Sequence, residues 1–281
     1  MTNDRPIAQG SMTGSPGGVP EAAGDPAAPI SLSIDAGVAV ATLCRPPVNA
    51  IDDAWVERLN RVLDAVEADE QVRVLWIRSE QRVFCAGADL AFMRQRFATA
   101  EGRCAMIDFT RRLQQVYARI ERSPRVSVAE IGGPALGGGF ELALACDLRV
   151  VADEARLGLP EARLGLLPAA GGTQRMTRIC GESTARRLIL GAEVLQGAEA
   201  VGLGLAQWHA PAAQLRAVAG GVVERIAALP VAALRESKRC IGAALDARLD
   251  GYEVELEGSG ALLALQETQD RVRRFLERDA S

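Results

Sequence analysis

The sequence predicts an α/β fold with a helical region at its C-terminal end, and three observations support this prediction. Segments typical of strands and of helices alternate between residues 30 and 152, as expected for repeated α/β units. Three consecutive glycines, Gly137 to Gly139, follow a β-rich run and open an apolar run of helical character. From about residue 215 to the end, nearly every segment has helical character.

The individual elements follow from local patterns. Residues 30–34 and 38–43 are expected to form a hairpin, because Asp35-Ala36-Gly37 between them is typical of a turn. Apolar side chains recur at helical spacing over 53–68 and again from Met106 to Ile120, where Ser123-Pro124 ends the helix. The remaining expected elements are strands over 72–77, 125–131 and 147–152, a short helix over 140–145, and two short helices over 173–180 and 183–190.

The last part of the chain differs from the rest. Helices are expected over 217–228, 234–245, 253–267 and 270–277. This group of helices is too small to form a hydrophobic core of its own, so it must pack on the first domain or on another subunit. We therefore expect three regions, namely a disordered tail rich in Gly, Pro, Ala and Ser over 1–28, a core over 29–214 and a helical oligomerisation module over 215–281.

Composition and charge argue against several classes of partner. The chain has 281 residues, of which 48% are hydrophobic, and a formal net charge of −4. This acidic balance gives no general electrostatic reason to bind nucleic acid or an anionic membrane. No apolar run approaches the length of a bilayer span, and the N-terminus lacks the layout of a secretory signal.

Cysteine and histidine usage adds two expectations. The six cysteines are scattered without a C-x-x-C pair, so we expect reduced thiols in a cytoplasmic protein. The single histidine, His209, precedes Ala210-Pro211 in an expected loop and is interpreted as structural or surface-exposed. Catalysis by a Ser-His or Cys-His pair would have to use that one residue.

The stretch from Ala135 to Asp147 is the principal candidate site. Glycines let the backbone turn sharply, and a helix start leaves several N–H groups unpaired, which can hold an oxygen on which negative charge develops. Glu141 lies one turn into the helix between Phe140 and Leu142. Apolar surroundings raise the pKa of a carboxyl group toward the value that acid–base catalysis near neutral pH needs. The alternative interpretation is a glycine-rich packing turn followed by a solvated glutamate.

Three segments resemble motifs of the crotonase (enoyl-CoA hydratase/isomerase) superfamily. Phe84-Cys85-Ala86-Gly87-Ala88-Asp89-Leu90 resembles its first oxyanion-loop motif, and Ala135 to Asp147 resembles its second. Gly158-Leu159-Pro160-Glu161 through Gly171-Gly172-Thr173-Gln174-Arg175 resembles its third. The resemblance runs from about residue 30 to the end, and it implies a spiral of stacked ββα units whose C-terminal helices build a trimer or a dimer of trimers.

The resemblance also implies roles for individual residues. The backbone N–H groups of Ala88 and Gly138 would hold the thioester oxygen of an acyl-CoA, which becomes an enolate-like anion during the reaction. Glu141 would take a proton from the water that attacks C3, and Glu161 would supply the proton that arrives at C2. Isomerases of the superfamily usually retain only the acid at the position of Glu161, so the presence of both glutamates favours a hydratase.

Further substrate contacts are implied by the same motifs. The residues concerned are Ala86, Asp89, Leu90, Gly137, Pro160, Ala169, Gly172 and, in the last helix, Phe275, which would cover the adenine. Ala169 stands where some hydratases have a glycine whose N–H helps to hold the catalytic water. Many relatives bind the CoA phosphates with basic residues where this chain has Ala91 and Pro47-Val48. Arg45, Arg94 or Arg96 would then have to substitute.

The function predicted from these residues is that of an enoyl-CoA hydratase. Its substrate would be an acyl-CoA thioester, with coenzyme A as part of the substrate and with no metal or redox cofactor. One alternative is an isomerase or another acyl-CoA reaction that uses the same oxyanion hole. A second alternative is a non-catalytic CoA-binding or RNA-binding member, against which the acidic charge and the two glutamates both argue.

Overall fold

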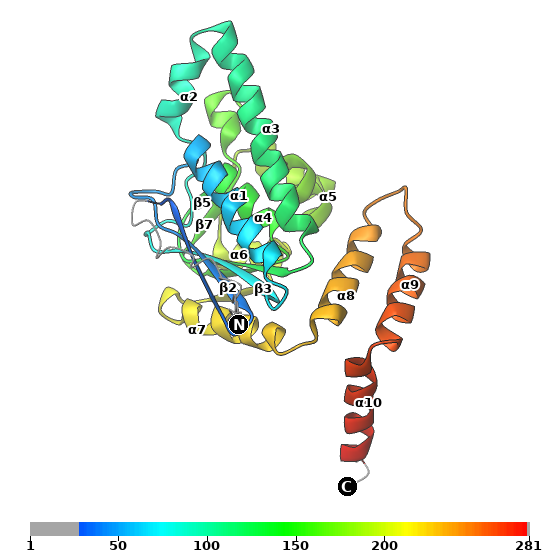
Figure 1. The fold of residues 1–281 in the computed structure, drawn as a ribbon. Coiled ribbons are helices and arrows are strands. Elements are labelled where there is room, and N and C mark those ends of the chain that lie inside the picture. Colours follow the sequence, from blue (N-terminus) through cyan, green and yellow to red (C-terminus); the bar gives the residue numbers. More distant parts are fainter. Residues whose placement is uncertain (1–27, 280–281) are drawn as a thin grey trace, which may run out of the picture.

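The computed structural model describes residues 28–279, and a six-stranded sheet lies at the centre of its body (Figure 1). The strand order is β1-β2-β3-β4-β6-β9. β1 and β2 pair antiparallel as the expected hairpin, and each later strand joins in parallel. These strands span Ile30–Asp35, Val38–Leu43, Val74–Ser79, Val126–Ile131, Leu148–Ala152 and Trp208–Ala210. The tail expected over 1–28 lies, apart from residue 28, outside the described residues.

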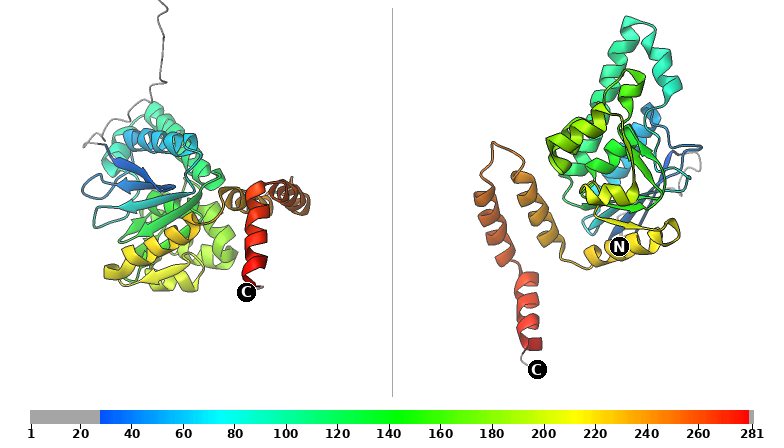
Figure 2. Two further views of the ribbon diagram at one scale, coloured as in Figure 1. Left: turned by 60° about the horizontal axis from the view of Figure 1, so that its bottom comes forward. Right: turned by 180° about the vertical axis from the view of Figure 1, so that it is seen from behind.

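Helices cover both faces of this sheet. α1 (Asp53–Ala68) and α7 (Ala212–Ala227) lie on opposite faces, as the left view of Figure 2 shows. α1 is also packed against the long helix α3 (Ala100–Arg122). The other helices of the body are α2 (Leu90–Phe97), α4 (Gly138–Ala145), α5 (Gly172–Leu190) and α6 (Gly197–Gly202).

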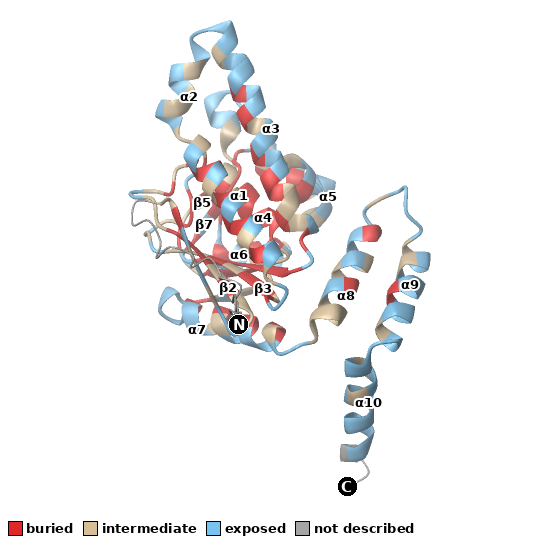
Figure 3. Ribbon diagram, viewed as in Figure 1, coloured by how far each residue is buried: buried red, intermediate tan, exposed pale blue. Residues whose placement is uncertain are grey.

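The core lies between the sheet and its helices (Figure 3). All six residues of β4 are buried, as expected for a parallel strand that is covered on both faces. α1 contributes Trp55, Leu59 and Leu63, whose spacing places them on one face of the helix. Because few aromatic residues are available, the core is built mostly from Ala, Val, Leu and Ile.

A second sheet of three short strands positions the glycine turn. Its strands are β5 (Ala135–Leu136), β7 (Arg156–Gly158) and β8 (Val194–Gln196). β5 and β7 are parallel, with Leu136 opposite Gly158, so the residues after these strands emerge at the same edge. The start of α4 follows β5, and the 3₁₀-helix η1 (Glu161–Leu164) follows β7. This pairing brings the helix that carries Glu141 next to the turn that carries Glu161.

The C-terminal helices leave the body only after α7. α7 packs on β3, β4, β6 and β9. α8 (Val231–Ala243) contacts the body at β4 and through Lys238, which donates to Asp147, whereas α9 (Gly251–Leu263) and α10 (Gln266–Asp279) extend away from the body (Figure 2). The helical module therefore separates from the body near residue 230 and not at residue 215, because the apolar face of α7 is buried on the sheet. No single helix within residues 28–279 is long and apolar enough to span a membrane, and only the bent pair α7 and α8 together reaches that length and composition.

The structure adds elements that the sequence pattern does not predict. None of the residues of α2 is buried, and its 8 residues are too few for a helical period to be recognised with certainty. β5 and β7–β9 have only two or three residues each, which is too short for alternation to show. The two helices expected over 173–180 and 183–190 form the two halves of α5, which is kinked between them at Gly181, where φ is +78°.

Candidate active site

The three motif segments meet at one cavity of about 220 Å³. The first segment precedes α2, the second spans β5 and α4, and the third runs from β7 through η1 to α5. Side chains of α2 and α3 complete the walls. The lining includes the predicted residues Ala86, Ala88, Leu90, Gly137, Gly138, Glu141, Pro160, Glu161 and Ala169.

Two backbone N–H groups in the cavity wall are available for a ligand. Gly138 is the first residue of α4, so its N–H has no partner within the helix. Ala88 forms a parallel bridge with Ile51. In this bridge the N–H of Ile51 donates to the carbonyl oxygen of Gly87, and the N–H of Asp89 donates to the carbonyl oxygen of Ile51. The N–H of Ala88 therefore points to the other side, where Gly138 lies. Within residues 28–279, neither N–H has a protein acceptor.

Glycines permit this close approach of the first motif to α4. Gly87 has a φ of +93°, and a Cβ there would lie 3.2 Å from the nitrogen of Gly138. A Cβ on Gly139 would overlap the backbone of Cys85. Larger residues at these positions would push the two N–H groups apart, so the glycines set the spacing of the pair.

Glu141 is held inside the cavity wall with its carboxylate oriented. Glu141 is only 2% exposed, and its Oε1 accepts a hydrogen bond of 2.7 Å from the backbone N–H of Gly172. Burial raises the pKa of Glu141 to about 7 from an ordinary value of 4.5. The hydrogen bond from Gly172 opposes this rise in pKa, and the charge of Glu161 adds to it. A carboxyl group with this pKa exchanges protons readily near neutral pH.

Glu161 lies in the part of the cavity wall that η1 forms, at the first position of this helix. Burial also raises the pKa of this carboxyl group. Its Oε2 is buried and has no hydrogen-bond partner among the described residues, and its Oε1 lies near Gly137, where an added Cβ would be 3.1 Å away. Two carboxyl groups that face one cavity repel each other when both are ionised, so the pair retains a proton more readily than either would alone.

Comparisons with known proteins identify the family of this chain. A family model described as enoyl-CoA hydratase/isomerase matches residues 33–280. The chain belongs to this family. A probable enoyl-CoA hydratase of Bacillus subtilis (strain 168) is 35% identical over 257 residues, which cover 89% of this chain and 96% of that protein.

Two further matches show how far the likeness extends. The mitochondrial methylglutaconyl-CoA hydratase of Mus musculus is 42% identical over 158 residues, which are 56% of this chain and 49% of that protein. The structure of DspI from Pseudomonas aeruginosa is 30% identical and superposes with a TM-score of 0.84, covering 92% of this chain and 97% of that one. The predicted crotonase-type α/β fold is thereby confirmed.

In this member of the enoyl-CoA hydratase/isomerase family, an arginine fixes the turn that orients Glu141. The Nη1 of Arg175 donates to the carbonyl oxygen of Ala170 at 2.9 Å, directly before the turn that ends in Gly172. Nε and Nη2 of the same guanidinium donate to Glu121 of α3 at 3.2 and 3.0 Å. The side chain of Arg175 is 7% exposed, so its position is well defined by these contacts. The sequence indicates Arg175 as part of the third motif but does not reveal its partners.

α3 supports the cavity from behind through two polar side chains. The hydroxyl group of the buried Tyr117 donates to the carbonyl oxygen of Gly138 at 2.8 Å. The Nε2 of Gln114 donates to the carbonyl oxygen of Ala169 at 2.6 Å. Sequence reasoning assigns Tyr117 to the apolar face of this helix and misses both contacts, because periodicity gives the face of a side chain but not its hydrogen-bond partner.

Four predicted residues need separate comment. The carboxylate of Asp89 accepts the N–H groups of Ala91 and Phe92, so it caps α2 and does not line the cavity. Gly172 contributes its N–H to Glu141, as described above. Ala169 lies in the lining without a positive φ, so alanine is compatible with the backbone there. Phe275 is 65% exposed on α10, which extends away from the body, and it does not line this cavity.

The three arginines considered for the CoA phosphates differ in their contacts. Arg45 forms an ion pair with Asp52 at 2.6 Å, and Arg96 forms one with Asp53 at 2.7 Å. Arg94 is exposed and has no ion pair among the described residues. His209 is also exposed and pairs with Asp153 at 2.6 Å, in β9 and not in the expected loop, which confirms its predicted surface position.

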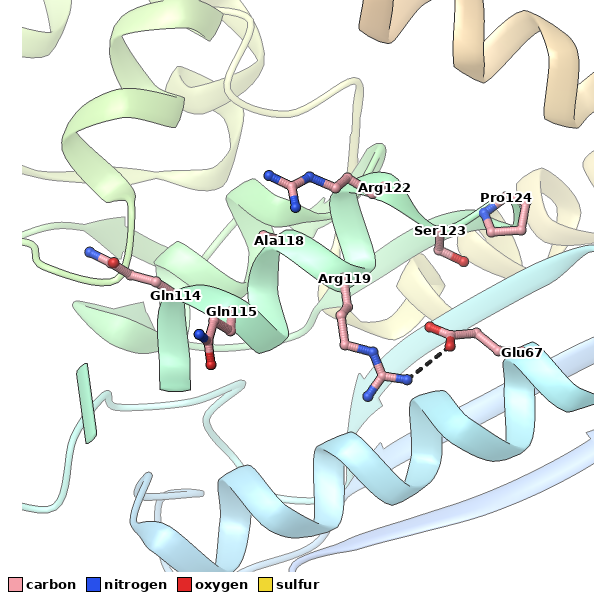
Figure 4. A pocket seen from close by; sticks show the side chains of 8 residues that line it. All are labelled: Glu67, Gln114, Gln115, Ala118, Arg119, Arg122, Ser123 and Pro124. Carbon is pink, nitrogen blue, oxygen red and sulfur yellow. Dashed lines mark hydrogen bonds and ion pairs between the residues drawn. The ribbon is translucent and has the colours of Figure 1, made fainter. Parts of the chain in front are cut away.

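A larger hollow of about 550 Å³ lies along α3, outside the motif segments (Figure 4). It is lined by Glu67 and by polar residues of α3, and Arg119 in it donates to Glu67 at 2.9 Å and to Asp64 at 2.8 Å. Of its two arginines, Arg119 is neutralised by these contacts and Arg122 has no ion pair among the described residues. The hollow contains neither glutamate of the pair nor the two free N–H groups. The smaller cavity therefore remains the candidate active site of this family member.

Proposed function

We propose that this protein is an enoyl-CoA hydratase, which adds water across a trans-2-enoyl-CoA to give a 3-hydroxyacyl-CoA. The observation that carries the proposal is the arrangement of one cavity, in which two free backbone N–H groups share the lining with two carboxyl groups of raised pKa. We propose that the reaction needs no metal or redox cofactor, since these groups supply both charge stabilisation and proton transfer.

In the proposed steps, one water molecule is added across one carbon–carbon double bond. The thioester oxygen accepts hydrogen bonds from the N–H groups of Ala88 and Gly138, which stabilise the negative charge that develops on it. The carboxylate of Glu141 removes a proton from water as the water oxygen bonds to C3. The electron pair of the double bond moves to C2 and the thioester, and the carboxyl group of Glu161 then protonates C2. Proton exchange between the two glutamates through solvent restores the starting state.

The test compares hydration with isomerisation in the native protein. Hydration of crotonyl-CoA removes the absorbance of the conjugated enoyl thioester, whereas isomerisation of trans-3-hexenoyl-CoA creates it. The proposal predicts rapid loss of absorbance with the first substrate and formation of 3-hydroxybutyryl-CoA. Activity on the second substrate alone would replace the hydratase with the isomerase alternative.

We also propose that Arg94 binds the phosphates of coenzyme A. Arg94 lies in α2, which begins at Leu90, the last residue of the first motif. Unlike Arg45 and Arg96, it is not engaged in an ion pair among the described residues. Replacing it by alanine should raise KM for crotonyl-CoA about threefold to tenfold and leave kcat unchanged, because an exposed phosphate contact contributes to binding but not to the chemical step. A matched Arg111→Ala variant should retain the native KM.

For the assembled state we propose a homotrimer or a dimer of trimers in the cytoplasm. Large apolar side chains are exposed along the C-terminal helices, among them Ile241, Tyr252 and Leu256, which are 72%, 82% and 66% exposed. A hollow of about 710 Å³ is lined by residues of α8 and of the C-terminal end of α3. The six cysteines are all free thiols, which suits a reducing compartment. Sedimentation at several concentrations measures the oligomeric state directly.

A further inference from the structure

The walls of the candidate cavity carry charge of one sign only. Glu141 and Glu161 are the charged residues among those that line it, and both are anionic when ionised. The wall beyond them is formed by apolar side chains, including Met93, Met106 and Phe109. Within residues 28–279, no lysine, arginine or histidine lines this cavity.

Two arginines on α2 and α3 beside this wall are already neutralised. Arg96 and Arg112 both bind the carboxylate of Asp53, and Arg96 is stacked 3.6 Å from the ring centre of Phe92. Arg111 lines an adjoining hollow that shares Thr110 and Leu167 with the cavity, but it pairs with Asp108. Arg94 of α2 has no ion pair among the described residues, but it is exposed to solvent and does not line the cavity. A negatively charged group inside the cavity would therefore find no cation in the lining and would face two carboxyl groups.

We propose that this chain acts on enoyl-CoA thioesters with an uncharged, apolar acyl chain and rejects those that carry a second carboxylate at the far end. This inference rests on the proposed function, because it names the substrate class of the same site. Burial of an apolar chain against Met106 and Phe109 is favourable, whereas burial of an unpaired carboxylate is strongly unfavourable. The volume of the cavity, about 220 Å³, corresponds to about seven groups the size of a water molecule or a methylene, so a chain of moderate length fits.

Two substrates of equal chain length isolate the effect of a charge at the far end of the acyl chain. trans-2-Hexenoyl-CoA ends in a methyl group, and trans-2-hexenedioyl-CoA ends in a carboxylate at the same carbon. The native protein should hydrate the second with a kcat/KM at least about thirtyfold lower than the first, given the cost of an unpaired buried charge. A smaller difference would overturn the inference.

A pair of matched variants tests whether charge is the cause. Leu167 lines the cavity and is 66% exposed, so a polar substitution there is compatible with folding. Leu167→Arg should raise kcat/KM for hexenedioyl-CoA relative to hexenoyl-CoA at least about tenfold, because it supplies the missing cation. Leu167→Gln should not change this ratio. Equal ratios in the two variants would contradict the electrostatic explanation.

Binding of saturated thioesters separates this inference from the proposed function. Calorimetry with hexanoyl-CoA and adipyl-CoA requires no hydration. Tighter binding of hexanoyl-CoA, by the same factor of about thirty, would support the charge selection even if neither enoyl-CoA were hydrated, in which case the proposed function alone would fail. Equal binding of the two ligands would overturn the inference whether or not the protein is a hydratase.

Discussion

Glu141 lies in the α4 wall of the cavity and Glu161 lies in the η1 wall, and the two walls are built differently. Glu141 is buried, and its carboxylate is held by the N–H of Gly172 in a turn that Arg175 fixes. Glu161 is partly exposed, and one of its oxygens has no partner among the described residues. The first carboxylate is thus oriented in advance by the protein, and the second retains a free oxygen for the substrate. This difference suits a base that orients water and an acid that delivers a proton.

The comparison predicts the largest effect on stability for Glu141. Between a pKa of 4.5 in the unfolded chain and about 7 in the folded protein, the folded state holds a proton that the unfolded state has released. Stability is therefore highest below the unfolded value and falls as the pH rises through this window, by about 3 kcal/mol in total. Glu141→Gln should remove this dependence and make the protein more stable than the native chain at pH 8.

Urea unfolding at pH 5 and pH 8 measures this effect. Glu161→Gln serves as the comparison, since its carboxyl group is more accessible and should give a smaller change with pH. A Glu141→Gln variant with the same pH dependence as the native protein would show that this carboxyl group is not held in a buried, pKa-raising position.

The second prediction concerns the turn that holds Glu141. A Cβ on Gly172 would lie 2.8 Å from its Oε1 and 2.9 Å from Leu159 Cδ1, so Gly172→Ala must displace the carboxylate. We expect kcat to fall about a hundredfold, because small displacements of catalytic groups are costly. Gly221→Ala on α7 is the matched control, since nothing lies within 4 Å of an added Cβ there, and its kcat should stay at the native value. A native kcat for Gly172→Ala would contradict the claim that the turn at Gly172 orients the carboxylate of Glu141.

The third prediction concerns the charge of Arg175, which lowers the pKa of Glu141. Arg175→Met should move the acidic limb of the pH profile of kcat/KM to higher pH and reduce kcat about tenfold, because the turn loses its hydrogen bond and the carboxylate loses a nearby cation. Arg175→Lys should restore the limb in part. Arg178→Met is the control, since Arg178 also binds Glu121, at 3.1 Å, but does not contact the turn. An equal shift in both Met variants would show that Arg175 acts on the helix as a whole.

The smallest expected effect belongs to Tyr117, which supports the α4 wall through the carbonyl oxygen of Gly138. Tyr117→Phe keeps the buried ring and removes one hydrogen bond, so it should cost about 1 kcal/mol of stability. We expect kcat to fall about threefold to tenfold with KM unchanged, because the neighbouring N–H of Gly138 stabilises charge mainly in the transition state. An altered KM with a normal kcat would place Tyr117 in substrate binding instead.

The sequence predicts the parts of this site better than their assembly. The alternation of strands and helices, the glycine turn and the apolar neighbours of Glu141 each leave a local pattern, and the structure agrees with all three. That Glu161 shares a cavity with Glu141 depends on the pairing of β5 with β7, which are too short to be recognised from alternation. The facing of Ala88 and Gly138 depends on backbone contacts between distant segments, which only the resemblance to a family anticipates.

The C-terminal region shows the same limit at the level of the fold. Helical periodicity correctly indicates α7 to α10, but it assigns α7 to the separate module. The apolar face of α7 is buried on the sheet, whereas those of the later helices are exposed in the single chain. Periodicity shows that a helix has an apolar face, and it does not show what that face contacts.

The central claim is that two glutamates divide the chemistry of hydration, and the hydration rates of Glu141→Gln and Glu161→Gln test it most directly. Loss of the enoyl-thioester absorbance of crotonyl-CoA is measured for both variants and for the native protein, with binding of butyryl-CoA confirming that each site is intact. We predict that each substitution lowers kcat by about two orders of magnitude or more. A Glu141→Gln variant that hydrates crotonyl-CoA at close to the native rate would contradict the account.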